Sequence, residues 1–281
     1  MRVEEIAKRL RALTGRYGLY DVFRDWVAAM ACAISNAVDR RPEIWKQREA
    51  EYMAIVKRYG DDAQKVMNTF AELQGGLVMA LEGEADDVLG RLYMTMELGN
   101  QHAGQFFTPM SVCDLMAEMT LHDTPLPPCG FVTMQEPAIG GGAMVIAYAR
   151  VMQRRGLDPS RHIHVTGIDI DRKVLQMAYV QLSLLGVPAV LYVGDTLRLE
   201  MREDWYTPVH VLAGWSQRLA LAGAYDRARA ALAEVIEEVD TVAEPPPEPA
   251  YMPPEQPPAE EPAGEPAGEP AAPRKAQLTL F

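Results

Sequence analysis

The sequence predicts an α/β protein in which an all-helical N-terminal part precedes a small parallel sheet flanked by helices, with a disordered tail at the end. Apolar residues recur at helical spacing through residues 1–100, and short apolar runs separated by glycine turns follow from about residue 129. Proline and glutamate dominate from about residue 243. These changes divide the chain into a helical domain (1–100), an α/β domain (101–240), a Pro/Glu/Ala linker (241–276) and a C-terminal peptide (277–281).

Composition excludes several classes of protein. The 281 residues carry a net charge of -12, which argues against gripping nucleic acid by bulk electrostatics alone. No apolar run approaches the roughly 20 residues of a membrane span, and the N-terminus lacks a signal-peptide layout. Three cysteines are too few and too scattered for a disulfide framework or a thiolate metal cluster. We therefore expect a cytoplasmic protein with no membrane contact and no metal.

The helical part is predicted from two apolar series. One comprises Val66, Phe70, Leu73, Leu77 and Leu81, and the other Trp45, Tyr52, Ile55, Val56 and Tyr59. Both repeat at the spacing of one helix face, so each predicts an amphipathic helix.

The sheet is predicted from four short apolar runs that alternate with helical segments. They are Phe131–Met134, His164–Ile168, Ala189–Val193 and Val209–Leu212. Strands that alternate with helices form a parallel sheet covered by helices. A last amphipathic helix is expected from about Ser216 to Val239.

A glycine-rich turn, Glu136-Pro-Ala-Ile-Gly-Gly-Gly142, follows the first predicted strand. Glycines at a strand-to-helix turn let the backbone approach a ligand closely, although a simple tight turn of small residues explains them equally well. Asp169 ends the second strand, where a carboxylate can hold a ribose diol, and Asp195 ends the third, where an adenine amine could donate to it. Helix caps are the alternative for these carboxylates. Because carboxyl ends of parallel strands meet at one edge, we expect a single crevice for an adenosyl group.

Upstream, Gly104-Gln-Phe-Phe-Thr-Pro109 precedes a helical pattern. A capped helix start, with Thr108 as N-cap and Pro109 as first helical residue, explains the last two residues. Together with the three later motifs, however, the series resembles the adenine-specific DNA methyltransferases related to the modification subunits of type I restriction systems. The resemblance covers about residues 100–200, and the helical N-terminal part is also similar in character.

The resemblance implies a truncated Rossmann-like methyltransferase sheet and S-adenosyl-L-methionine as cofactor. It places Phe107, Thr108 and Pro109 in the cofactor pocket, with core packing as the alternative for Phe107. By the same resemblance the methionine moiety is surrounded by Glu136, Gly140 and Gly142, the ribose is bound by Asp169, and the adenine ring by Asp195.

The chain departs from this family at the catalytic tetrapeptide, Asn or Asp, then Pro-Pro, then Tyr or Phe, which occurs nowhere in the sequence. Leu212-Ala-Gly-Trp-Ser216 stands at the expected place, the tip of the fourth predicted strand. The nearest candidates for a catalytic role are His210, Trp215 and Ser216, although isolated polar residues beside a strand are usually structural. The family also continues with three more strands and a target-recognition region, whereas here one helix leads into the tail.

Three hypotheses remain open. The chain is a DNA adenine methyltransferase or one half of a split one, a non-catalytic adaptor or restriction-modification mimic that keeps the pocket, or a helical interaction protein with a vestigial sheet. DNA and a complementary methyltransferase or specificity subunit are the expected partners of the first two.

The C-terminal peptide Gln277-Leu-Thr-Leu-Phe281 resembles the bacterial sliding-clamp binding motif. By that resemblance Gln277 bonds the pocket rim, Leu278 belongs to the docking peptide, and Leu280 and Phe281 are the buried anchors. An incidental hydrophobic end is the alternative. The proline-rich spacer before it could reach up to about 100 Å, which would hold the body near DNA through the clamp.

Overall fold

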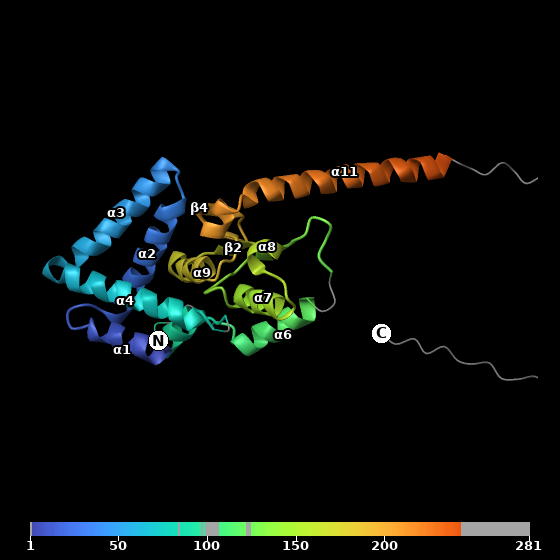
Figure 1. Ribbon diagram of the computed structural model, residues 1–281. Coiled ribbons are helices and arrows are strands. Elements are labelled where there is room, and N and C mark those ends of the chain that lie inside the picture. Colours follow the sequence, from blue (N-terminus) through green and yellow to red (C-terminus); the bar gives the residue numbers. More distant parts are fainter. Residues whose placement is uncertain (1, 84, 97, 99–106, 122–124, 243–281) are drawn as a thin grey trace, which may run out of the picture. The chain divides into compact units, whose positions relative to one another are not determined.

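The computed structural model describes residues 2–83, 85–96, 98, 107–121 and 125–242 (Figure 1). Met1–Arg229 forms one compact unit and Ala230–Phe281 a second, so the N-terminal helices and the sheet lie in the same unit. The C-terminal peptide and nearly all of the predicted linker fall outside the described residues. No helix in the described ranges is both long and apolar enough to span a bilayer.

The N-terminal region is helical, as predicted. Its elements are α1 (Val3–Ala12), α2 (Leu19–Val38), α3 (Pro42–Arg58), the 3-10 turn η1 (Gly60–Asp62), α4 (Ala63–Leu81) and α5 (Val88–Thr95). All five residues of the apolar series on α4 are buried, which confirms that periodicity. On α3 only part of the predicted face is inside, because Trp45 is exposed while the charged Arg48 is buried.

The second half holds a four-stranded sheet in the order β1-β2-β3-β4. Its strands are β1 (Val132–Glu136), β2 (Ile163–Asp169), β3 (Ala189–Asp195) and β4 (Glu200–Tyr206). The other helices of this half are α6 (Met110–Leu121), α7 (Ala143–Arg154), α8 (Pro159–His162), α9 (Arg172–Leu184), α10 (Pro208–Leu212) and α11 (Trp215–Val242). The first three strands are parallel, as expected for strands joined through helices.

Two features of the predicted sheet are wrong. The run Val209–Leu212 is helix α10 rather than a strand, because Pro208 occupies the first helical position, where its fixed φ and missing N–H cost nothing. The fourth strand is β4 instead, and it pairs antiparallel with β3, so the sheet is mixed. The sequence of β4, Glu-Met-Arg-Glu-Asp-Trp-Tyr, hides this strand because its charged side chains suit a sheet edge and interrupt any apolar alternation.

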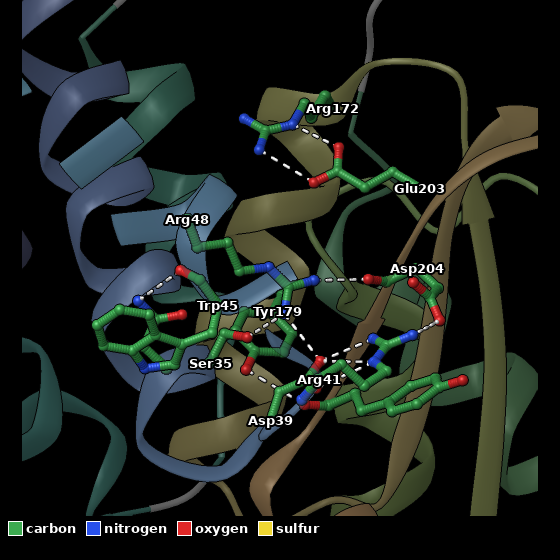
Figure 2. Close-up of polar contacts among 11 residues, drawn as sticks. Ser35, Asp39, Arg41, Trp45, Arg48, Arg172, Tyr179, Glu203 and Asp204 are labelled. Atoms are coloured by element: carbon green, nitrogen blue, oxygen red, sulfur yellow. Dashed lines mark hydrogen bonds and ion pairs between the residues drawn. The ribbon is translucent and has the colours of Figure 1, made fainter. Parts of the chain in front are cut away.

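A cluster of charged residues, buried at Arg48 and Asp39, joins the helical region to the sheet (Figure 2). Arg48 of α3 is 1% exposed, donates to Asp39 Oδ2 at 3.0 Å and to the Asp204 carbonyl of β4 at 2.6 Å, and stacks over Trp205 at 4.0 Å. Arg41 donates to the Asp204 carboxylate at 2.6 Å. Helix α2 packs against α9 beside this cluster, and one apolar core runs continuously from α1 to β4. The helices therefore support the sheet from within the same core.

Candidate functional site

The glycine turn after β1 is fixed to the end of β2. Gly140 and Gly142 have φ of +58° and +95°, the left-handed region that residues with a Cβ rarely adopt. Between β1 and these glycines, the Ile139 N–H donates to the Ile168 carbonyl at 2.9 Å. The Ile139 side chain covers Gly167, where an added Cβ would lie 2.4 Å from it. The left-handed φ therefore requires glycine at positions 140 and 142, whereas at Gly167 an added Cβ would meet the ends of the Ile139 and Leu191 side chains.

Asp169 links the tips of β1 and β2. Its Oδ2 accepts from the Gly140 N–H at 2.9 Å and its Oδ1 from the Asp171 N–H at 2.9 Å. Burial raises the pKa of the Asp169 carboxyl, and the backbone donors oppose that rise only in part. A carboxylate has about four acceptor sites, so Asp169 has capacity left beyond its backbone donors for a donor such as a hydroxyl.

The tip of β3 joins the same edge through Thr196, whose hydroxyl donates to the Pro137 carbonyl in the turn after β1 at 2.6 Å. Asp195 uses Oδ1 to accept from the Leu197 and Arg198 N–H groups at 3.0 and 3.2 Å, so it shapes the turn into β4. Glu136 is half-buried, and its Oε1 accepts from the Ala138 N–H at 3.2 Å. The structure thus brings the tips of β1, β2 and β3 together.

Glu136 also lines a cavity of about 440 Å³. That cavity lies between α6, β1 and α7, with Met116, Met144 and Tyr148 in its wall, rather than between Asp169 and Asp195.

Phe107 lies against the glycine turn. Its ring is 3.6 Å from where a Cβ on Gly140 would stand and 3.5 Å from the same point on Gly141, and it meets Tyr93 edge-on at 5.5 Å between ring centroids. Thr108 and Pro109 are exposed and precede α6, which begins at Met110. The first three residues of their motif, positions 104–106, fall outside the described ranges. Phe107 therefore packs on Tyr93, as the core-packing alternative expects, and also covers the glycine turn; its place in a cofactor pocket stays a prediction.

Two buried residues that the sequence analysis missed, Gln181 and Asp87, hold the glycine turn in place through hydrogen bonds. Gln181 of α9 donates from Nε2 to the Gly141 carbonyl at 2.9 Å and to Asp87 Oδ1 at 2.8 Å. Asp87 caps α5 by accepting from the Gly90 N–H at 2.8 Å, and burial raises the pKa of its carboxyl. A capping Asp before α5 was readable in the sequence, but nothing in the pattern of α9 distinguishes Gln181 from an ordinary surface amide.

The three catalytic candidates, His210, Trp215 and Ser216, lie at the amino-terminal ends of the parallel strands, opposite the ends that carry Asp169 and Asp195. Because β4 runs antiparallel to β3, the chain returns to the amino ends of the strands before α10 begins. There His210 Nδ1 is 2.8 Å from His164 Nε2 near the start of β2, and His210 Nε2 is 3.1 Å from Ser216 Oγ. His164 is five residues before Asp169, a separation of about 16 Å along a strand.

These three residues are therefore too far from Asp169 to act on a group held beside it. Trp215 is fully buried and packs edge-on against Phe131, so it presents no free face to a base. Burial lowers the pKa of both histidines, that of His164 to about 4. The expectation that they stand at the tip of a fourth parallel strand is wrong, because that part of the chain forms α10, which lies at the amino-terminal ends of the strands.

One family model matches part of this chain. The family described as N-6 DNA Methylase matches residues 84–214. Among curated proteins, none matches this chain.

Two solved structures are similar at low identity. One is a Listeria monocytogenes protein described as a class I S-adenosylmethionine-dependent methyltransferase, with 17% identity and a TM-score of 0.37, over 69% of this chain and 54% of that one. The other is the methyltransferase subunit of a type I restriction-modification system from Streptococcus thermophilus, with 17% identity and a TM-score of 0.37, over 72% and 59% of the two chains. The chain thus spans little more than half of either. By sequence, the segment that carries the glycine turn and all three acidic strand tips, residues 84–214, is similar to the N-6 DNA methylase family.

Proposed function

We propose that this chain is a methyltransferase-like protein that binds S-adenosyl-L-methionine at the carboxyl edge of β1, β2 and β3 and acts on DNA together with other proteins. The observation that carries the proposal is the hydrogen bond between Asp169 and the Gly140 N–H, with Phe107 lying on the same turn. This hydrogen bond connects a carboxylate at the strand end where ribose is commonly bound to a glycine backbone that a ligand can approach closely.

The residues at this edge suit the cofactor. Gly140 and Gly142 leave the turn without side chains at left-handed positions, and Glu136 stands at its start, where the methionine moiety would lie. Asp169 would accept from the ribose hydroxyls with its remaining lone pairs, and Asp195 would face the adenine ring. Phe107, with Thr108 and Pro109, would cover the adenosyl group from the α6 side. When bound, the cofactor supplies an electrophilic methyl group.

Methyl transfer needs a further set of groups that orient the target amine and stack on the base. His210, Trp215 and Ser216, the candidates in this chain, belong to a cluster at the amino edge of the sheet. We therefore propose that the chain by itself binds the cofactor without transferring the methyl group, and that a complementary methyltransferase or specificity subunit supplies what transfer requires.

Calorimetric titration with S-adenosyl-L-methionine tests the site. The Asp169→Ala variant should bind at least tenfold more weakly than the unmodified protein, since the ribose contact and the brace on Gly140 are both lost. Asp61→Ala, which changes an exposed carboxylate in η1, is the matched control and should bind as the unmodified protein does. Unchanged affinity in Asp169→Ala would remove the basis of the proposal.

A separate assay decides between enzyme and adaptor. The purified chain is incubated with DNA and cofactor labelled in the methyl group, and we expect no label in the DNA. Incorporation by the chain alone would show that it is a complete enzyme and would overturn the adaptor proposal while leaving the cofactor site intact.

The C-terminal peptide is proposed as a docking segment for the bacterial sliding clamp. This rests on the sequence Gln277 to Phe281 and on its place after a proline-rich spacer. Surface plasmon resonance with immobilised clamp should detect the full chain and lose the signal when residues 277–281 are deleted. A control chain of unchanged length, with the same five residues in scrambled order, should also fail to bind, whereas binding by the truncated chain would refute the assignment.

A further inference from the structure

The outer edge of β1 is an unprotected sheet edge. β1 pairs with β2 on one side, and no strand within the described ranges pairs with its other side. β4, at the opposite edge of the sheet, carries Glu200, Arg202, Glu203 and Asp204, and such charges discourage another strand from joining. β1 reads Val-Thr-Met-Gln-Glu and carries a single charged residue, Glu136 at its end, so this protection is concentrated on the β4 edge.

An apolar groove accompanies this edge. On one face of β1, Val132 and Met134 are half-buried and border the cavity of about 440 Å³ that α6 and α7 enclose with the strand. The groove continues onto α6, whose outer side carries an apolar stripe at i, i+3, i+4 and i+7. The stripe consists of Val112, Leu115, Met116 and Met119, which are 43%, 61%, 49% and 72% exposed. Apolar groups grouped in this way on a folded surface mark a binding site.

The strand can pair with a second copy of itself in antiparallel orientation without placing like charges opposite each other. In the register centred on Met134, Thr133 faces Gln135 of the second copy and Met134 faces its own counterpart. Val132 faces Glu136, so the two Glu136 carboxylates stand about 13 Å apart along the strands, beyond the screening length of about 10 Å at 0.1 M salt. Because paired positions keep the same parity, the half-buried residues of both copies share one face and the exposed Thr133 and Gln135 share the other.

We propose that this edge is a dimer interface, in which two copies of the chain pair their β1 strands antiparallel about a two-fold axis at Met134. The pairing continues the sheet from one copy into the other, and brings the two apolar grooves beside each other on one face. The chain's own tail is a poor competitor for the edge, since 12 of the chain's 21 prolines lie between residues 244 and 273 and proline cannot donate to a sheet ladder. This inference is independent of the proposed function, although a dimer would carry two cofactor sites.

Light scattering coupled to size exclusion, with the full chain at micromolar concentration, should give twice the chain mass of 31.1 kDa. Two double variants at the exposed positions then test the register. Thr133→Lys with Gln135→Lys places like charges opposite each other in both cross-strand pairs, and should raise the dissociation constant of the dimer at least about tenfold. Thr133→Glu with Gln135→Lys places opposite charges there and should keep the dimer. Both variants alter solvent-facing side chains, and circular dichroism checks that they fold alike.

A disulfide probe gives a second readout. In a Cys129→Ser background, which removes the one exposed thiol among the three cysteines, Met134→Cys should form a covalent dimer on mild oxidation. Residues that face each other in antiparallel strands have Cα atoms about 4.5–5.5 Å apart, which suits a disulfide. A monomer at all concentrations would overturn the proposal. A dimer that both double variants leave unchanged, or that Met134→Cys does not cross-link, would also overturn it, because pairing would then use another surface.

Discussion

Replacing Arg48 by methionine should destabilise the whole Met1–Arg229 unit, because this one guanidinium ties α2 and α3 to β4. Arg48 donates to Asp39 and to the Asp204 carbonyl and contacts the Ser35 hydroxyl, all in a site where it is 1% exposed. Methionine keeps the length of the side chain and its packing on Trp205 but none of the donors.

The loss of stability expected from Arg48→Met depends on which hydrogen-bond partners Asp39 keeps in the variant. Removing one member of a buried ion pair usually costs about 3–5 kcal/mol. Burial would raise the pKa of the Asp39 carboxyl, but hydrogen bonds from Arg41 outweigh it and hold that pKa below its usual range. Since Arg41 stays in place, Asp39 is not left alone, and we expect the lower end, about 3 kcal/mol.

Urea denaturation followed by circular dichroism and tryptophan fluorescence measures this change. With a slope of about 2 kcal/mol/M, the midpoint should fall by about 1.5 M while the two probes still coincide. Arg9→Met, which breaks the exposed pair with Glu72, should cost less than about 1 kcal/mol. A loss below about 1 kcal/mol for Arg48→Met, or separate transitions for the two probes, would refute the argument that the cluster joins the helices and the sheet into one cooperative unit.

Three further outcomes are expected. Gly142→Ala should lower the free energy of unfolding by about 1–2 kcal/mol and weaken cofactor binding, because φ is +95°, a left-handed conformation that residues with a Cβ rarely adopt, while the new Cβ would only reach ordinary contact distance from Ala178. Gly75→Ala in the open middle of α4 should instead stabilise by up to about 1 kcal/mol, and chemical denaturation with calorimetry compares the two. Ellman's reagent should modify only Cys129 quickly in the native protein, since the other cysteines are buried and burial raises their pKa; a second fast thiol would contradict the packing. Burial lowers the pKa of His164 to about 4, so between about pH 6.5 and 4 the unfolded chain binds a proton that the folded chain does not, and stability should fall as the pH falls. His164→Gln should flatten that pH dependence in urea titrations, and an unchanged slope would show that the histidine does not cause it.

Local pattern was enough to predict the helical N-terminal part and the three parallel strands. The apolar series on α4 is buried throughout, and the runs ending at Asp169 and Asp195 are parallel strands in adjacent positions. A short, mostly apolar run of four residues, however, does not distinguish a strand from a short helix. Val209–Leu212 was predicted as a strand for that reason, and β4 was missed because its charges belong to an edge.

The candidate site, like the fold, could be predicted from the sequence only in part. The glycine turn could be predicted because it depends only on the local backbone conformation, and glycine is the residue type that favours that conformation. Asp87 and Gln181 could not, since they act on the turn through contacts between residues 94 positions apart. The position of His210 and Ser216 could not be predicted either, because the antiparallel direction of β4 places them at the amino-terminal ends of the parallel strands instead of the carboxyl ends.

The sequence by itself determined the helical N-terminal part, the order of the first three strands, the glycine turn with its acidic companions, and the composition of the tail, because each depends on residues near one another along the chain. Tertiary structure alone decided that Arg48 is buried, that Asp169 bonds the Gly140 N–H, and that β1 is an unprotected edge. These depend on which strand lies beside which and in what direction, and that choice is made by the packing of the whole core rather than by any local preference.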